Sequence, residues 1–451
     1  MNALVLASLL AAAAEPSPIT LDQARAQGRQ STTALQSAID VEVAEQDVRV
    51  SRSALLPQLA VGASAGKRWI GRSRSFSLVP NPNDDPNVTG DEFVQAPVET
   101  KATSTTDYDL SATLTQVIYD RARWKQLEQS GVLRDAQKSQ AQEEADTSEL
   151  EAVRRFFALF RTQASRQVLE ATVKRSEDQL ERARSLFQAG RVGKVEEISA
   201  LVNLGNDRIT YTQSMAQLVT DQTSLAVWLT RPGTEPLLAV DPGVLQTEPA
   251  PAPSIDEAIS VARDRRPLLK TLQLRVRSAE LQRAIARADY IPKLSAQGFY
   301  TRRGPDASDV FAEPRLQNNF IASIDLNWNI FNGFNTDAQS KRADATIRKA
   351  QLTLEQSARE IEGEVRAAHQ ALEAQIAAAR LAADNKGAAV QGLSLAEERF
   401  KAGVGSTLEV RDAQLSLTQS ELSLLQNRID VEIARYRLLR AMGALGPGET
   451  K

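Results

Sequence analysis

The sequence predicts a mainly α-helical protein with a smaller β-sheet part, built as a tandem repeat of one structural unit. Three observations carry this prediction. Four landmarks recur in the same order in both halves, two helical stretches are about seventy residues long, and several short segments alternate strictly in polarity. The composition agrees, because aromatic residues are only 5% of the 451 residues, which is low for an enzyme and usual for long helices.

The composition also excludes several functional classes. With 54 Lys and Arg against 57 Asp and Glu, the net charge of −3 gives no preference for nucleic acid. The absence of Cys and the single His369 leave no thiolate site, no cysteine nucleophile and no His-based metal cluster. We therefore predict no catalytic site, no metal and no cofactor. No run of 18 apolar residues is present to form a membrane-spanning helix.

The first residues have the pattern of an export signal. An apolar run over residues 3–14 ends in three alanines and is followed by Glu15 and Pro16. This pattern predicts a secretory signal peptide over residues 1–14, cleaved after Ala14. A buried terminal helix stays open as the alternative, because the segment before the run has no Lys or Arg.

An internal duplication defines the domain organisation. The matched landmarks are Leu21–Ala24 with Ile255–Ala258, Leu56–Leu59 with Ile291–Leu294, Leu114–Tyr119 with Leu326–Phe331, and Phe187–Gly190 with Phe400–Gly403. The offset falls from 235 to 212 residues between the second and third landmarks, so the first half carries 23 additional residues there. We assign them to a long polar loop within residues 75–106. The repeats are residues 15–230 and 254–445, and the Pro-rich residues 231–253 link them.

Each repeat is predicted to contain a helix, a β-hairpin, a long helix and a short helix. The long helices, over residues 119–189 and 335–402, are each ~100 Å long at 1.5 Å per residue, which no compact domain accommodates. The shorter helices cover residues 20–55, 193–229, 254–290 and 406–442. The last one has two heptad stripes, beginning at Leu408 and Val410, on opposite sides. Two apolar flanks indicate a helix that stands in a wall between two neighbours, and a broad core-facing surface in an ordinary bundle is the alternative.

The two predicted hairpins, residues 58–118 and 293–331, alternate apolar and polar side chains with a period of two. Strands of about 11 residues with aromatic residues at their ends suit a bilayer, with apolar side chains facing lipid. The clearest set of predicted lipid-facing residues is Phe320, Ala322, Ile324, Leu326, Trp328 and Ile330. Four strands leave open edges, which lipid does not tolerate, so a barrel must be shared between chains. Two copies give eight strands and a filled interior, whereas three give twelve and an open lumen; we favour the trimer.

At this point the sequence resembles the TolC-type outer-membrane efflux proteins. The resemblance rests on Leu-Pro-x-Leu at Pro57 and Pro292, the segment that ends at Phe334, and the run from Ser406 to Ala413. It implies a homotrimer with a twelve-stranded transmembrane β-barrel in outer-membrane lipid, joined to a long periplasmic α-helical barrel. The implied partners are a periplasmic adaptor (membrane fusion) protein and an inner-membrane pump.

The resemblance also implies site residues. Glu409 and Asp412, with Glu196 in the first half, match the acidic positions that line the tunnel's constriction in this family. Three symmetry copies then form a charged ring that attracts cations; the alternative is that such carboxylates only complement the helix macrodipole. The first tip departs from the pattern, with Ser199 where the second has Asp412. The predicted adaptor-contact tips are Gly190, Arg191, Val192, Gly193, Gly403, Val404, Gly405 and Ser406.

The leading functional hypothesis is a passive exit duct of a tripartite efflux or type I secretion system. A soluble coiled-coil scaffold is the alternative, and an enzyme is a distant third. Drugs, metal ions and secreted polypeptides all remain open as cargo. Lys67, Arg68, Arg72 and Arg74 follow the first alternating segment and face either anionic headgroups or a soluble loop.

Overall fold

The structure is a computed structural model that describes residues 16–83, 86, 89–90, 93–312 and 318–446. The predicted signal peptide, residues 1–14, lies outside the described residues. The chain divides into two units. The first unit comprises residues 1–46, 131–279 and 346–451, and the second comprises residues 47–130 and 280–345.

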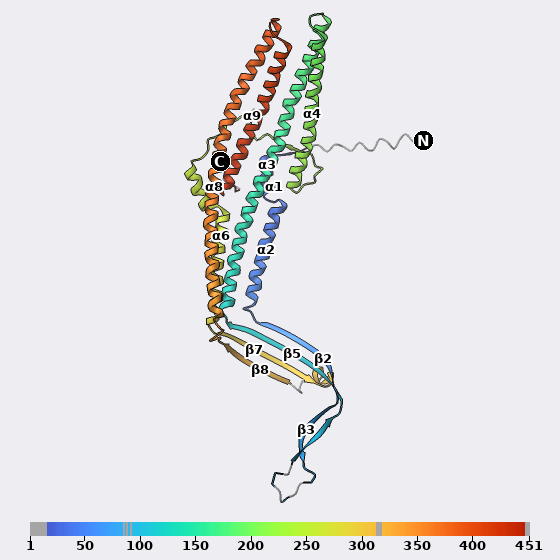
Figure 1. Ribbon diagram of the computed structural model, residues 1–451, viewed down its shortest axis with the longest axis vertical. Helices are drawn as coiled ribbons and strands as arrows, with labels where there is room; N and C mark the ends of the chain where they lie inside the picture. Colours follow the sequence, from blue (N-terminus) through green and yellow to red (C-terminus); the bar gives the residue numbers. More distant parts are fainter. Residues whose placement is uncertain (1–15, 84–85, 87–88, 91–92, 313–317, 447–451) are drawn as a thin grey trace, which may run out of the picture. The chain divides into compact units, whose positions relative to one another are not determined.

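Two antiparallel helical hairpins dominate the first unit (Figure 1). One hairpin joins α3 (Arg121–Gln188) to α4 (Lys194–Trp228), and the other joins α8 (Asn335–Lys401) to α9 (Thr407–Ala441). The lengths of α3 and α8, 68 and 67 residues, confirm the two long helices that the sequence predicts. The remaining helices of the described chain are α1 (Leu21–Gly28), α2 (Thr32–Ser53), α5 (Ile255–Arg265), α6 (Pro267–Ala286), and, in the second unit, the 3-10 turn η1 (Arg287–Tyr290) and α7 (Ala307–Phe311).

Two of the predicted short helices are each broken in two, which corrects the sequence prediction. The helix expected over residues 254–290 breaks before Pro267, because a proline ring pushes the preceding residue out of the helical region; Arg266 has ψ of 117°. The helix expected over residues 20–55 ends at Gly28, where a Cβ atom would lie 2.4 Å from the Cβ of Ala152 on α3. The chain restarts as α2 after Ser31, whose hydroxyl accepts from the amide of Ala34.

The core of the helical unit lies where the two hairpins meet the first residues of the chain. Phe156 and Phe157 of α3 are fully buried and pack edge to face, with ring centroids 5.6 Å apart. The same core takes in Ile19 of β1 (Ser17–Ile19), which pairs in parallel with β6 (Leu237–Ala239) inside the predicted linker. This pair fixes the start of the first repeat to the segment that joins the two repeats.

The two apolar stripes of α9 have different environments. Val410 and Leu438 of one stripe are each 2% exposed and pack inside the unit, whereas Leu408 of the other stripe is 67% exposed. On α4, Leu204 is buried and Val195 is 72% exposed. Within one chain, only one of the two predicted flanks is therefore covered near the helix tips.

The second unit contains a four-stranded antiparallel sheet in the order β2-β5-β7-β8. Its strands are β2 (Gln58–Ile70), β5 (Thr103–Tyr119), β7 (Lys293–Gly304) and β8 (Asn318–Asn327). The central pair, β5 with β7, joins the first repeat to the second, with Ala112 opposite Tyr300.

The loop expected over residues 75–106 is mostly strand, which corrects the prediction. β3 (Ser73–Pro80) and β4 (Phe93–Thr100) form a separate antiparallel hairpin, and β5 already begins at Thr103. The prolines in this segment indicated a loop, because proline has no backbone N–H to donate. In a two-stranded ribbon, however, each strand is paired on one side only, so a proline whose nitrogen points to the unpaired side removes no hydrogen bond between the strands. The second predicted hairpin is shorter than expected, because β8 ends at Asn327 and leaves Trp328 and Ile330 beyond the strand.

Across the described residues, no helix combines the length and the hydropathy that crossing a bilayer requires.

Candidate functional site

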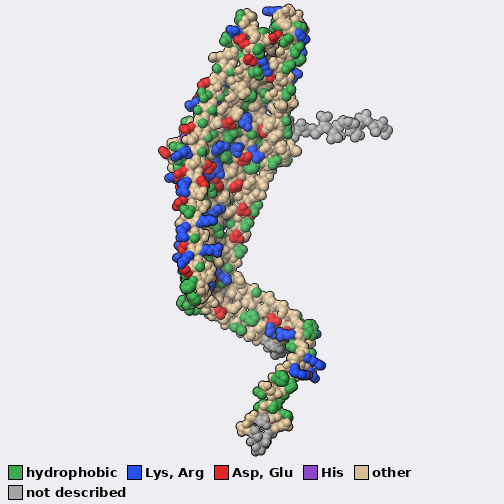
Figure 2. All heavy atoms as spheres, in the orientation of Figure 1, with side chains coloured by type: hydrophobic (Ala, Val, Ile, Leu, Met, Phe, Trp, Pro, Cys, Tyr) green, Lys and Arg blue, Asp and Glu red, His purple; other side chains and the backbone are tan. Residues whose placement is uncertain are grey.

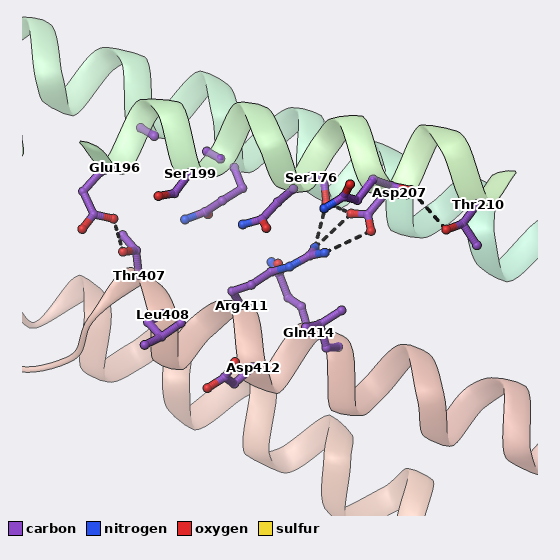
Figure 3. Close-up of a pocket in the computed structure, with 16 residues that line it drawn as sticks. Ser176, Glu196, Ser199, Asp207, Thr210, Thr407, Leu408, Arg411, Asp412 and Gln414 are labelled. Carbon is purple, nitrogen blue, oxygen red and sulfur yellow. Dashed lines mark hydrogen bonds and ion pairs between the residues drawn. The ribbon is translucent and has the colours of Figure 1, made fainter. Parts of the chain in front are cut away.

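A polar groove of about 720 Å³ lies near the tips of the helical hairpins, between α3, α4 and α9 (Figure 3). Both hairpin turns depend on glycine. Gly190 and Gly403 have φ of 68° and 78°, in the left-handed region that favours glycine. Gly405 has no room for a side chain, because a Cβ atom would lie 2.9 Å from the amide nitrogen of Phe400. α9 then begins at Thr407 and is capped by Ser406, whose hydroxyl accepts a hydrogen bond from the amide of Glu409 at 3.1 Å.

An ion pair across the groove ties α9 to α4. The guanidinium of Arg411 extends from α9 toward α4 and bonds both carboxylate oxygens of Asp207, at 2.9 and 3.0 Å (Figure 3). Ser176 of α3 donates its hydroxyl to the same carboxylate and accepts from Arg411 at 3.2 Å. Since the side chains of Arg411 and Asp207 are only 14% and 12% exposed, this is a largely desolvated pair with bidentate geometry.

The groove brings together two of the three predicted constriction residues. Glu196 accepts a hydrogen bond from Thr407 across the tips, and Asp412 lines the same groove and is exposed. Ser199 lines it as well, at the position that matches Asp412 in the first repeat. With Asp207 paired to Arg411, the carboxylates of Glu196 and Asp412 leave the groove with an excess of negative charge.

Glu409 lies elsewhere. Its carboxylate faces α8 and forms an ion pair with Arg399 at 3.1 Å, lining a second, smaller hollow of about 230 Å³. A three-residue spacing on a helix rotates the second side chain by about 60° relative to the first, which separates the two carboxylates between neighbouring grooves. Within one chain, Glu409 and Asp412 therefore line different hollows.

Carboxylates near the first tip are also paired. Lys194 hydrogen-bonds Glu197, lowering the pKa of that carboxyl group, and Arg184 on α3 lies 3.6 Å from the same carboxylate. Among the described residues, no group of three or more Asp, Glu or His side chains is arranged to hold a metal ion. The groove can attract cations without a built coordination site.

The ion pair between Asp207 and Arg411 was not predicted from the sequence. The sequence does give a signal for Asp207, because this charge lies between Leu204 and Tyr211, two apolar residues of α4 that are seven positions apart and therefore on one side of the helix. No such spacing identifies Arg411 as its partner, since 204 residues separate the two positions.

The predicted tip residues lie at the two helix turns. Gly190 to Gly193 separate α3 from α4, and Gly403 to Ser406 separate α8 from α9. Arg191 is exposed and Val404 is 69% exposed, so both turns present side chains to solvent in a single chain.

The sheet of the second unit carries one continuous apolar face. In an antiparallel sheet, residues opposite each other lie on the same face. The register places Leu114 opposite both Leu59 and Gly298, and Ile324 opposite Ala296. The register also places Gln116, opposite Ala296, and Arg302, opposite Leu110 and Asn318, on this face. Its other residues are Leu59, Val61, Ala63, Ala65, Tyr108, Leu110, Ala112, Leu114, Leu294, Ala296, Gly298, Tyr300, Phe320, Ala322, Ile324 and Leu326.

The apolar face is open to its surroundings and bordered by aromatic residues. Ile324 is 72% exposed, and Tyr300 lies beside Phe320 near the end of the face farthest from the helices. Tyr119 borders the opposite end, and Trp328 follows the end of β8 and donates its indole N–H to the carbonyl of Tyr290. The opposite face is mainly Ser, Thr, Asp and Gln; its apolar residues include Val117 opposite Ser295 and Phe299 opposite Ile321.

Long antiparallel helical hairpins and a sheet with one apolar face are the two components of outer-membrane channel protomers. The model of the outer membrane efflux protein family matches residues 22–230 and 258–444, leaving out the predicted linker. The chain belongs to the outer membrane efflux protein family, and the resemblance found in the sequence is confirmed. Its location is the outer membrane, and the family consists of channels rather than enzymes.

Individual relatives support this assignment. Over 288 residues the chain is 25% identical to the toluene efflux pump outer membrane protein TtgC of Pseudomonas putida, a match that covers 62% of this chain and 57% of TtgC. The matched part thus spans just over half of that relative. The fold is similar to the CmeC outer membrane channel of Campylobacter jejuni (TM-score 0.71, 15% identity, 96% of this chain and 87% of CmeC). It is also similar to the open state of the MtrE outer membrane channel of Neisseria gonorrhoeae (TM-score 0.69, 15% identity, 96% of this chain and 91% of MtrE).

Proposed function

We propose that the protein is the outer-membrane exit duct of a tripartite efflux pump, and that it works as a homotrimer. Cargo enters through the helical part and leaves through a twelve-stranded barrel, without chemical change and without energy supplied by this protein. The observation that carries the proposal is the open, apolar face of a sheet that has two unpaired edges.

The sheet is incomplete in one chain. Among the described residues, β2 and β8 each pair with a neighbour on one side only. An unpaired edge in lipid costs several kcal/mol for each backbone group left without a partner, so β8 of one copy must pair with β2 of the next. Three copies close twelve strands around an open lumen, whereas two close eight around a filled one.

The helical part carries matching apolar surfaces. Ile39 and Val43 of α2 are more than half exposed, as are Val195 and Val202 of α4. Water-exposed apolar stripes on helices of this length favour burial against another chain. A neighbouring copy provides that surface, and the wall of helices inferred from the sequence then closes into a tunnel.

The tips define the proposed contacts with other components. Gly190 to Gly193 and Gly403 to Ser406 are proposed to meet a periplasmic adaptor protein, which connects the duct to an inner-membrane pump. Glu196 and Asp412, with Glu409, are proposed to line the constriction, where threefold symmetry repeats each carboxylate around the axis.

Two classes of cargo fit the proposed duct. TtgC is named for toluene efflux, and a small apolar molecule is therefore one candidate here. A type I secretion system, with an unfolded polypeptide as cargo, uses the same kind of duct and is the second candidate.

Purified protein in detergent tests the proposal. We expect a mass of three chains, migration on gels that changes with heating, and stepwise conductance in planar bilayers. A monomer with intact strands, or a trimer without conductance, would contradict it. A soluble coiled-coil scaffold, the alternative raised by the sequence, would remain in the soluble fraction after cell lysis.

A further inference from the structure

A cluster of basic side chains lies at the end of the sheet where β2 and β5 connect to the hairpin of β3 and β4. Residues 67–76 and 97–106 contain five Lys and Arg and one Glu, in a chain whose net charge is −3. Figure 2 shows Lys and Arg side chains gathered at this place. Three of them form what we call the basic cluster: Lys67, Arg72 and Lys101. Arg68 lies opposite Thr105 on the polar face of the sheet, and Arg74 pairs with Glu99.

The positive charge of the basic cluster is not neutralised within the described part of the chain. The carboxylate of Glu99 is paired with Arg74, whose Nε donates a hydrogen bond to it at 3.0 Å. No member of the basic cluster forms an ion pair with another described residue, and all three are exposed. Arg72 lies in the short link between β2 and β3, and Lys101 lies in the short link between β4 and β5. The two residues are next to Ser73 and Thr100, which are opposite each other in the β3–β4 hairpin. Like charges held this close repel one another unless an anion lies between them.

The basic cluster lies at the border of the apolar face. Lys67 follows Ala65 on that face, and its ammonium group lies over the ring of Trp69, 5.5 Å from the centroid. Indole rings favour the boundary between hydrocarbon and headgroups in a bilayer. Lysine and arginine extend their charged ends from such a position toward the headgroups while their stems remain against apolar surface.

The connections of the strands identify which side of the membrane this is. Both long links of the sheet, residues 71–102 and 305–317, leave it at the end that carries the basic cluster, whereas the other strand ends lead to helices. Membrane barrels have their longer loops on the outside of the cell. The basic cluster therefore lies at the level of the outer leaflet.

We propose that the basic cluster binds the phosphate groups of an anionic lipid in the outer leaflet. Arginine matches phosphate oxygens with two parallel hydrogen bonds, and lysine supplies a point charge that follows the headgroup. This inference rests on the proposed function, because a trimeric barrel carries three such clusters around its rim and needs lipid against its apolar face.

The test compares lipid binding by three forms of the full chain, purified as trimers in detergent. The first is the wild type, and the second is K67Q/R72Q/K101Q. The third is the control K270Q/R348Q/K349Q, which likewise removes two lysines and one arginine, but from exposed helix positions. The probes are a fluorescent bis-phosphorylated glycolipid, the same glycolipid without phosphates, and a phosphatidylcholine.

We expect the cluster variant to bind the phosphorylated glycolipid at least about tenfold more weakly than the wild type, and the control variant to bind it as the wild type does. Added salt should weaken wild-type binding, because it screens the charges. Equal binding by all three proteins, or equal binding of both glycolipids by the wild type, would overturn the lipid site.

Conductance separates this result from the proposed function. If all three proteins conduct as trimers and bind the glycolipid equally, the exit duct stands and the lipid site fails. If none inserts into bilayers, the exit duct fails and the lipid site fails with it.

Discussion

At the scale of single residues, a buried group of charges joins segments that are far apart in the sequence. Nη1 of Arg29 lies 2.7 Å from carboxylate oxygens of both Asp146 and Glu149 and 2.8 Å from the carbonyl oxygen of Leu445. Arg266 is 3% exposed and bonds Glu143. Carboxylates at positions 143, 146 and 149 share one side of α3, so the arginines of other segments must come to them.

This arrangement makes the stability of the helical unit depend on pH. Burial, with some repulsion from Glu143 and Glu149, raises the pKa of Asp146 from 3.8 to about 6, although Arg29 opposes the shift. Between pH 4 and 6 the folded state therefore binds more protons than the unfolded state, and the free energy of unfolding falls as pH rises. The stabilisation that this carboxyl group gives the folded state is fully present below pH 4. It falls by ~3 kcal/mol at most as the pH rises, and the loss is complete above pH 6.

Asp146→Asn should flatten that pH dependence. We expect the difference in melting temperature between pH 4 and pH 6.5 to shrink relative to the wild type, at one protein concentration. The exposed Asp264→Asn serves as the control. Parallel pH profiles for the wild type and Asp146→Asn would show that Asp146 is not the titrating group.

The pair between Arg411 and Asp207 should contribute strongly to the folding of the tip. Arg411→Ala leaves the carboxylate of Asp207 largely buried without its cation, which costs about 3 kcal/mol of unfolding free energy. Replacing both residues, as Asp207→Asn with Arg411→Gln, should recover a large part of that loss. Denaturant unfolding measures both.

Arg208→Gln provides the comparison for the pair. The ion pair of Arg208 with Glu177 is exposed, with side-chain exposures of 60% and 46%. Arg208→Gln should therefore lower the free energy of unfolding by less than about 1 kcal/mol. Equal effects of Arg411→Ala and Arg208→Gln would mean that the groove pair is open to water.

At the scale of secondary-structure elements, strand parity separates the two faces of the sheet. Ile324 lies opposite Ala296 on the apolar face, and Ser323 lies opposite Gln297 on the polar face. A shift of one residue in register would exchange the two faces along the whole strand. Neighbouring positions of β8 therefore report on different environments.

Ile324→Arg should impair membrane insertion by about 2–4 kcal/mol, because it places a charge in lipid. Ser323→Arg should be tolerated, because it faces the water-filled lumen of the proposed barrel. The fraction of chains that show heat-modifiable migration after refolding into vesicles measures both effects. Equal damage from the two substitutions would mean that the faces are assigned wrongly.

At the scale of the whole molecule, the proposed trimer repeats each carboxylate of the tips three times. Crowded carboxylates attract cations, and divalent ions most of all. We expect a cation-selective channel in planar bilayers that divalent or trivalent cations block from the periplasmic side. The double variant E409A/D412A should weaken this block and the selectivity while the trimer stays intact.

The single variants should differ, since Arg399 already neutralises Glu409. Asp412→Ala should therefore account for most of the effect of the double variant, and Glu409→Ala for little of it. If the double variant keeps the wild-type block and selectivity, the constriction lies elsewhere. If Glu409→Ala has the larger effect, the pair with Arg399 does not persist in the trimer.

Local patterns in the sequence determined the duplicated organisation, the two long helices and the apolar face of the sheet. Each depends on spacings of a few residues, such as the period of two along Phe320, Ala322 and Ile324. Spacing also identified the glycines at the helix turns. The family assignment followed from the order of such motifs, and the family match confirmed it.

Only the tertiary structure decided which segments meet. The pairing of β5 with β7, the partner of Glu409 and the ion pair of Arg411 with Asp207 join positions that are distant in the sequence or lie on different helices. No periodicity encodes such a choice, because a charged side chain selects the nearest opposite charge after the helices have packed. The prolines within residues 75–106 led to a wrong loop prediction for a similar reason. The missing backbone N–H of a proline destabilises a strand only where a neighbouring strand would accept its hydrogen bond, and only the tertiary structure shows where that neighbour lies.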